Sequence, residues 1–208
     1  MIITISRQFA AGGSEVARRV AARLGWRLVD NELIEQVAEQ AGLPREEVAQ
    51  REERAPGFLE RLVRALGRAV PELFPQPAEK VPEPEEAELV RVTERVVADL
   101  CAEGNVVVVG RAAPAVLRQL ADALHVKVVA PKPFRIRRAS ERLGVKESEA
   151  AKALEDTDAG RARYHRQYYG RDWDDPANYH LVLNTEALGY DGAADLIVRA
   201  ARPQSSVP

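Results

Sequence analysis

The sequence contains few of the residues from which disulfide frameworks and metal centres are built. Its 208 residues include one cysteine, Cys101, and three histidines. A single cysteine excludes an intramolecular disulfide framework and a cysteine-based zinc site. Three histidines leave little material for a histidine-bound metal. The scarcity of cysteine leads us to expect a reducing, cytoplasmic compartment.

Long apolar runs and an excess of positive charge are also missing. No uncharged apolar run approaches the ~18 residues that span a bilayer, and residues 1–5 show no basic leader, so we expect no membrane span and no secretory signal. The net charge is −2, from 30 basic and 32 acidic side chains, whereas nucleic-acid binders are normally clearly basic. We therefore expect small-molecule partners, neither nucleic acid nor membrane, and a monomer or homodimer.

The basic residues that are present are mostly of one type. The chain has 25 arginines and five lysines. A guanidinium group can hold a phosphate through two parallel hydrogen bonds, whereas an ammonium acts as a point charge. The positions of the arginines therefore indicate where an anion could bind.

Five short apolar, β-branched segments predict five strands, at residues 2–5, 26–29, 106–109, 125–129 and 181–183. Apolar residues at helical spacing predict helices between and after these strands, at residues 14–24, 85–103, 112–121, 134–170 and 193–201. Strands that alternate with helices favour an α/β fold with a five-stranded parallel sheet and helices on both faces. Ligands of such sheets lie beyond the carboxyl ends of the strands, where Arg7, Asp30, Arg111, Pro131 and Asn184 stand.

Residues 51–84 differ in composition from the rest of the chain. A basic amphipathic stretch is followed by five prolines, which cannot lie inside regular elements at this density. We interpret this segment as an insertion that carries a small helical cap and a semi-rigid loop.

The loop after the first strand is the main candidate site. Residues 6–14 read Ser-Arg-Gln-Phe-Ala-Ala-Gly-Gly-Ser and lead into a helix, which is typical of an anion site built from backbone amides and the helix dipole. Against the phosphate-loop pattern G-x-x-x-x-G-K-[ST], Gly12 and Ser14 match, Arg7 takes the place of the first glycine, and Gly13 that of the lysine. The pattern alone equally allows a glycine-rich turn without a ligand.

Several segments together resemble a known family. They are residues 3–9 with the glycine pair at 12–13, and residues 29–34, 109–111, 133–138, 158–161, 179 and 184–185. In this order and spacing they resemble the cytidylate kinase-like family, a divergent branch of the P-loop nucleoside monophosphate kinases. The resemblance covers nearly the whole chain except residues 51–84. It implies a three-layer P-loop NTPase fold in one domain, residues 1–208, with helical lid insertions.

The resemblance also implies an activity: transfer of the γ-phosphoryl group of ATP, with Mg²⁺, to CMP, dCMP or a similar monophosphate. Residues 31–90 would form a monophosphate-binding insertion and residues 134–170 an Arg-rich lid. The implied donor-binding residues are Ser6, Gln8, Ala11, Gly12, Gly13, Ser14, Glu15, Asn184 and Thr185. The implied catalytic arginines are Arg111, Arg135, Arg138 and Arg161, to which we add Arg7 because it leaves the sheet at the start of the loop. Asp30 and Arg111 would bind the acceptor, and Ser14 the metal. As an acidic metal ligand we add Asp30, which stands at a strand end, with Asp158 a second candidate.

Two departures from the family pattern bear on catalysis. The phosphate-loop lysine is replaced by Gly13, and no acidic residue follows Val109. Loss of a charge at the transferred phosphate commonly costs several kcal/mol of barrier. Our hypothesis is that Arg7 replaces the lysine. The alternatives are a nucleotide-binding protein of the same fold with little catalysis, or a kinase for another small phosphate acceptor.

Some candidate residues also have structural interpretations. Arg111 could pair with a helix carboxylate. Three arginines on one helix cannot all face a site, so we assign Arg137, and likewise Arg163, to the surface. The aromatic group Tyr164, Tyr168, Tyr169 and Trp173 fits a core better than a base-stacking platform, and we expect His125 and Cys101 to be structural.

Overall fold

The computed structural model describes residues 1–29, 101–102, 104–110 and 112–201. Two predicted acceptor-binding residues, Asp30 and Arg111, lie outside the described residues. So do the whole predicted insertion at 31–90 and most of the helix predicted over 85–103.

Five parallel strands form one sheet, which confirms the predicted fold class. They are β1 (Ile2–Arg7), β2 (Arg27–Val29), β3 (Val106–Val109), β4 (Ala123–Val129) and β5 (Leu181–Asn184), in the order β2-β3-β1-β4-β5. The central strand β1 pairs with both β3 and β4. Its six residues are all buried, as expected for the middle of a parallel sheet that is covered on both faces.

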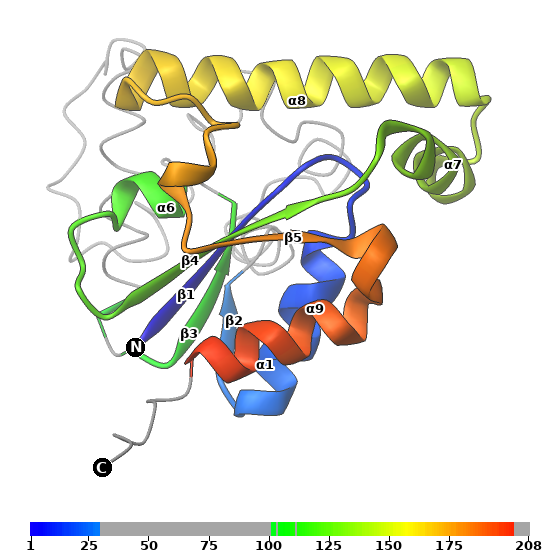
Figure 1. Cartoon of the computed structure of the whole chain (residues 1–208). Helices are drawn as coiled ribbons and strands as arrows, with labels where there is room; N and C mark the ends of the chain where they lie inside the picture. Colours follow the sequence, from blue (N-terminus) through cyan, green and yellow to red (C-terminus); the bar gives the residue numbers. More distant parts are fainter. Residues whose placement is uncertain (30–100, 103, 111, 202–208) are drawn as a thin grey trace, which may run out of the picture.

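Helices cover both faces of this sheet (Figure 1). On one side lie α1 (Gly13–Leu24) and α9 (Thr185–Ala201), and on the other α6 (Ala113–Val116) and the long α8 (Glu147–Tyr169). Helix α7 (Lys132–Leu143) precedes α8, and a short 3₁₀ turn (Pro176–Asn178) leads into β5. Among the described residues, no helix has the length and apolarity that a membrane crossing requires.

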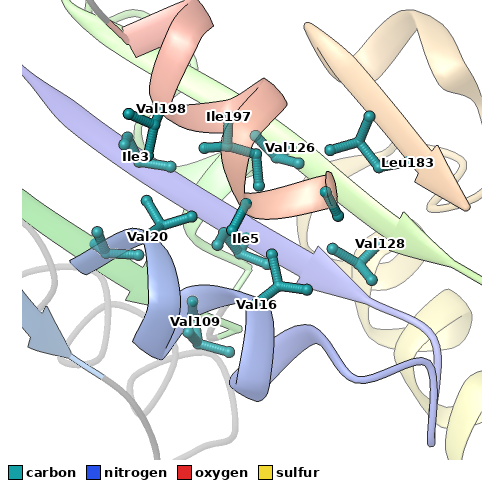
Figure 2. Packing of buried hydrophobic residues seen from close by; sticks show 14 of the residues in the cluster. Ile3, Ile5, Val16, Val20, Val109, Val126, Val128, Leu183, Ile197 and Val198 are labelled. Carbon is teal, nitrogen blue, oxygen red and sulfur yellow. The ribbon is translucent and has the colours of Figure 1, made fainter. Parts of the chain in front are cut away.

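The main core lies between the sheet and the pair α1–α9 (Figure 2). Ile3 and Ile5 of β1 alternate with polar residues and point to this side. Val16 and Val20, one helical turn apart on α1, pack against them, and Ile197 of α9 closes the cluster. These side chains expose 0% of their surface. Burial of this kind contributes about 1.5–3 kcal/mol per large aliphatic side chain, so it stabilises the packing of α1 and α9 on the sheet.

The opposite face of β1 and β4 carries a buried polar layer. The Oγ1 of Thr4 lies 2.8 Å from the Nδ1 of His125, whose ring stacks on that of His180 at 5.1 Å between centroids. Burial lowers the pKa of His125 to about 4, with smaller contributions from His180 and Arg171. Cys101 is buried as well, and burial raises the pKa of its thiol to about 11. Both residues are therefore part of the interior, as predicted.

Three helix boundaries differ from the prediction. The stretch 134–170 forms two helices, because α7 ends at Gly144 in the left-handed region (φ 65°). Helix α6 stops at Val116 instead of about 121, because tight turns from Leu117 to Leu120 and on to Ala123 lead the chain into β4. Helix α9 starts at Thr185 instead of 193 and is interrupted at Gly189, where ψ is 172°.

Candidate phosphate-binding site

The loop between β1 and α1 turns through two residues with positive φ. Ala10 (φ 58°) and Gly12 (φ 82°) are both in the left-handed region. A Cβ built at Gly12 would lie 2.3 Å from the ring of Tyr190. Gly12 caps the N-terminus of α1 without a side-chain hydrogen bond. The first amides of α1 are thus not capped by that residue and carry the positive end of the helix dipole, which favours an anion.

Arg7 and Gly13 fit together. A Cβ built at Gly13 would lie 2.4 Å from the Cβ of Arg7 and 2.7 Å from its Cγ. The aliphatic part of Arg7 thus fills the space from which a side chain at position 13 would emerge. A Cβ at Gly110 would likewise meet the Nη1 of Arg7 at 2.3 Å. The side chain present at position 7 and the one absent at position 13 therefore compete for the same space.

A cavity of about 600 Å³ opens over this loop. The loop lines it from Arg7 to Glu15, apart from Ala11, and α1, α7, α8 and α9 supply the remaining walls. Its charged side chains comprise six arginines and two glutamates: Arg7, Arg18, Arg19, Arg138, Arg142, Arg161, Glu15 and Glu141. An excess of guanidinium groups around a helix N-terminus suits a multiply charged phosphate chain.

The predicted lid arginines take three different positions. Arg138 and Arg161 line the cavity, whereas Arg135 does not. The Cζ of Arg138 lies 5.3 Å from the ring centre of Tyr190. Arg137 is exposed and 3.9 Å from Glu186, and Arg163 is exposed as well, so both belong to the surface as predicted.

Arg135, Arg161 and Asp158 form a buried network behind the loop. The Nη1 of Arg135 lies 2.5 Å from one oxygen of Asp158, and the Nη1 of Arg161 lies 3.6 Å from the other. Arg161 also donates to the backbone oxygen of Arg7 at 2.8 Å. Asp158, the second candidate for a metal ligand, is thus engaged with two cations.

Several predicted donor-binding residues brace the loop from behind. Ser6 accepts a hydrogen bond from the indole of Trp173 (2.9 Å), and Thr185 donates to the backbone oxygen of Ala11 (2.7 Å). The side-chain oxygen of Asn184 accepts from the amide of Glu186 at the start of α9. None of Ser6, Ala11, Asn184 and Thr185 is among the residues that line the cavity.

Gln8, Ser14 and Glu15 do line the cavity. Gln8 also fixes the loop, since its side-chain oxygen accepts from the amide of Ala130 at 3.2 Å. Glu15 pairs with Arg18 and Arg19 on the next turn of α1. The described ranges hold no cluster of three or more histidine, cysteine or carboxylate side chains that could hold a metal. Ser14 is therefore the one predicted metal ligand that can be placed at the cavity.

The aromatic group at residues 164–173 does not line this cavity. Trp173 is buried and belongs to the interior, as predicted, and the rings of Tyr164 and Tyr168 contact each other at 4.9 Å. Lys127 is also buried, on the far face of the sheet, where it donates to the backbone oxygen of Trp173 and pairs with Asp174. Burial lowers the pKa of this lysine. It does not line the cavity and so does not replace the missing phosphate-loop lysine.

Sequence reasoning missed five residues of the cavity: Arg18, Arg19, Glu141, Arg142 and Tyr190. The two arginines on α1 follow Ser14 by four and five positions, a spacing that could have placed them beside the loop. Nothing in the sequence signals Tyr190, which reaches Gly12 from α9. Its hydroxyl is buried and has no hydrogen-bond partner in the part of the chain that is described.

Comparisons with known proteins agree with this architecture. A family model described as the cytidylate kinase-like family matches residues 2–187. An uncharacterized protein from Eubacterium ventriosum superposes with a TM-score of 0.64 at 22% identity, over 97% of this chain and 98% of its own. Shikimate kinase from Bacteroides thetaiotaomicron superposes with a TM-score of 0.52 at 13% identity, over 96% and 97%. The fold is that of the P-loop kinases.

One curated relative matches over a shorter stretch. Uronate isomerase from Corynebacterium glutamicum is 33% identical over 117 residues, which make up 54% of this chain and 21% of that protein. The chain thus spans about a fifth of the length of this relative.

Proposed function

Since this chain belongs to the cytidylate kinase-like family, we propose that it transfers the γ-phosphoryl group of ATP to a nucleoside monophosphate, CMP or dCMP by preference. The observation that carries this proposal is the arginine-lined cavity over the N-terminus of α1, where Gly12 and Gly13 leave no room for a Cβ. We further propose that residues 1–208 act as one domain, in the cytoplasm, as a monomer or homodimer.

The donor phosphates would lie against the amides of residues 12–14. Phosphoryl transfer asks for alignment of two phosphates and neutralisation of charge on their oxygens, with little covalent chemistry from the protein. Arg7 would supply the charge that a phosphate-loop lysine normally supplies, since its stem occupies the space beside Gly13. Arg138 and Arg161 would face the transferred group from α7 and α8.

The implied Mg²⁺ fits a site with few protein ligands, because this ion usually keeps several waters and binds through substrate phosphates. Ser14 at the cavity and Asp30 would hold it, and the ion would neutralise the phosphate oxygens. Asp30, Arg111 and the insertion at 31–90 would bind the acceptor monophosphate. Arg135 and Thr185 would support the loop that binds the donor, through the backbone oxygens of Phe9 and Ala11, and Ser6 would do so through Trp173. Asn184 would hold the start of α9 beside them.

A coupled assay with ATP, Mg²⁺ and a panel of monophosphates tests the proposal. We expect turnover on CMP or dCMP. Tight ATP binding without turnover would instead indicate a nucleotide-binding protein of this fold. Turnover confined to a non-nucleotide acceptor would indicate a kinase of another small molecule. Absence of both binding and turnover would overturn the proposal.

A further inference from the structure

The backbone of one residue of the phosphate loop, Phe9, is held by helices far away in the sequence. The amide of Phe9 donates to the Oδ1 of Asp158 on α8 at 2.8 Å. The backbone oxygen of Phe9 accepts from the Nη1 of Arg135 on α7 at 3.3 Å, and the same nitrogen lies 2.5 Å from the Oδ2 of Asp158. Both polar groups of the Phe9 backbone are therefore bonded to one aspartate–arginine pair.

The side chain of Phe9 is held by the same two helices. It forms a separate hydrophobic cluster with Ala139 of α7 and with Ala150 and Leu154 of α8. The guanidinium of Arg142 lies 5.0 Å from the centre of the Phe9 ring. The loop is thus fixed to α7 and α8 at Phe9, while Ala10, Gly12 and Gly13 beyond it line the cavity.

Asp158 also holds an arginine of the cavity itself. Arg161 exposes 5% of its surface and Arg135 exposes 6%, and Asp158 lies between these two cations. Buried cations need a compensating negative charge. Loss of the Asp158 carboxylate would remove the negative charge that the two arginines share. Arg161 would then be held less firmly at the backbone oxygen of Arg7, to which it donates.

We infer that Asp158 is a positioning residue, which holds the phosphate loop at Phe9, together with Arg161, in the arrangement that binds the donor's phosphates. This inference rests on the proposed function for its ligand. It assigns Asp158 to the loop rather than to a metal, and it gives Arg135 a supporting role behind the cavity.

Charge alone and positioning predict opposite effects of removing this carboxylate. An aspartate near a phosphate site repels the ligand, so its loss should tighten binding if only Coulomb forces act. Its loss should weaken binding if it holds the loop. An amide cannot substitute, because one of its two ends is a donor. The substitution Asp158→Asn would therefore set an N–H group against either the Phe9 amide or Arg135.

The test compares Asp158→Asn with Asp156→Asn, which makes the same charge change at an exposed position of the same helix. Calorimetry measures the dissociation constants of the full chain for ATP and for inorganic tripolyphosphate. We expect Asp158→Asn to weaken both about tenfold, the size of one lost charged hydrogen bond, and Asp156→Asn to leave both unchanged. Unchanged or tighter binding by Asp158→Asn would overturn the inference.

Hydrogen exchange separates failure of this inference from failure of the proposed function. The Phe9 amide should be protected in the ligand-free wild-type protein, and in Asp156→Asn, and lose its protection in Asp158→Asn. Rapid exchange of this amide in the wild type would overturn the inference even if Asp158→Asn did not fold. A wild-type protein that binds neither ATP nor tripolyphosphate, yet protects the Phe9 amide, would overturn the proposed function alone.

Discussion

At the scale of single residues, the phosphate loop depends on close packing between Arg7 and Gly13. Arg7 fills the space that a side chain at position 13 would need, since the two Cβ positions would lie 2.4 Å apart. Both residues could be read from the sequence as departures from a pattern. The contact between them could not be predicted, because it depends on how the loop turns back on the end of β1.

We therefore predict that Gly13→Ala destabilises the protein and that Arg7→Gly relieves the effect. The added methyl group meets the stem of Arg7, and overpacking of this kind costs about 1–3 kcal/mol in the free energy of unfolding. Denaturant titration of the two single variants and the double variant measures the coupling between the sites. Additive effects in the double variant would contradict the steric pairing.

Tyr190 gives a second prediction at this scale. Its hydroxyl is buried without a partner among the described residues, while Arg19 and Arg138 lie 5.6 and 5.3 Å from the centre of its ring. A buried hydroxyl without a hydrogen bond is unfavourable. Tyr190→Phe should therefore leave the ligand-free protein equally stable or about 1 kcal/mol more stable in thermal unfolding.

The matched variant Tyr190→Leu removes the ring as well as the hydroxyl. It loses two cation–π contacts, each worth about 0.5–1 kcal/mol at partly exposed sites, and should melt at a lower temperature than Tyr190→Phe. A clear loss of stability in Tyr190→Phe itself would mean that the hydroxyl has a favourable partner.

At the scale of elements, the strands could be predicted because each carries its own signal. Residues 106–109 are four consecutive valines, and such a run is stable only where both faces are buried. Helix ends were predicted less well. Helix α6 ends early because turns lead the chain into β4. The break between α7 and α8 falls at Gly144, a glycine within the helical segment predicted at 134–170.

The stability of the protein should depend on pH through two histidines where β4 pairs with β5. The ring of His125 on β4 stacks on that of His180, the residue before β5, and burial lowers the pKa of His125 to about 4, against an ordinary value of about 6.5. The folded protein thus favours the neutral ring, and the unfolded chain binds the proton more tightly. Stability is full above about pH 6.5 and is lost as the pH falls towards 4.

The loss across this interval should be on the order of 3 kcal/mol at most, from about 1.4 kcal/mol per pKa unit. Urea unfolding between about pH 4 and 7.5 measures it. In His125→Asn, which has no titrating ring, the dependence on pH over this window should be shallower whatever its absolute stability. If the free energy of unfolding of His125→Asn changed with pH as steeply as that of the wild type, groups other than His125 would cause the pH dependence.

At the scale of the whole molecule, the cavity is assembled from segments that the sequence separates widely. The loop at residues 6–14 is contiguous and could be recognised by its glycines and its place after a strand. Arg142, Asp158 and Tyr190 stand more than 120 positions further along the chain. They reach the loop only because α7, α8 and α9 fold back on the ends of β1 and β4. No local pattern records these contacts, so the supporting half of the site had to come from the structure.

This assembly makes the cavity a cluster of positive charge in a protein whose net charge is −2. We predict that inorganic tripolyphosphate raises the melting temperature, because a ligand that binds only the folded state stabilises it by about 2.7 kcal/mol at a hundredfold excess over its dissociation constant. The increase should shrink between 0.1 and 1 M NaCl, as the screening length falls from about 10 to about 3 Å. The protein without tripolyphosphate at each salt concentration provides the baseline. Since six arginines surround the cavity, a stabilisation that is absent at low salt, or indifferent to salt, would contradict a polyphosphate site at the N-terminus of α1.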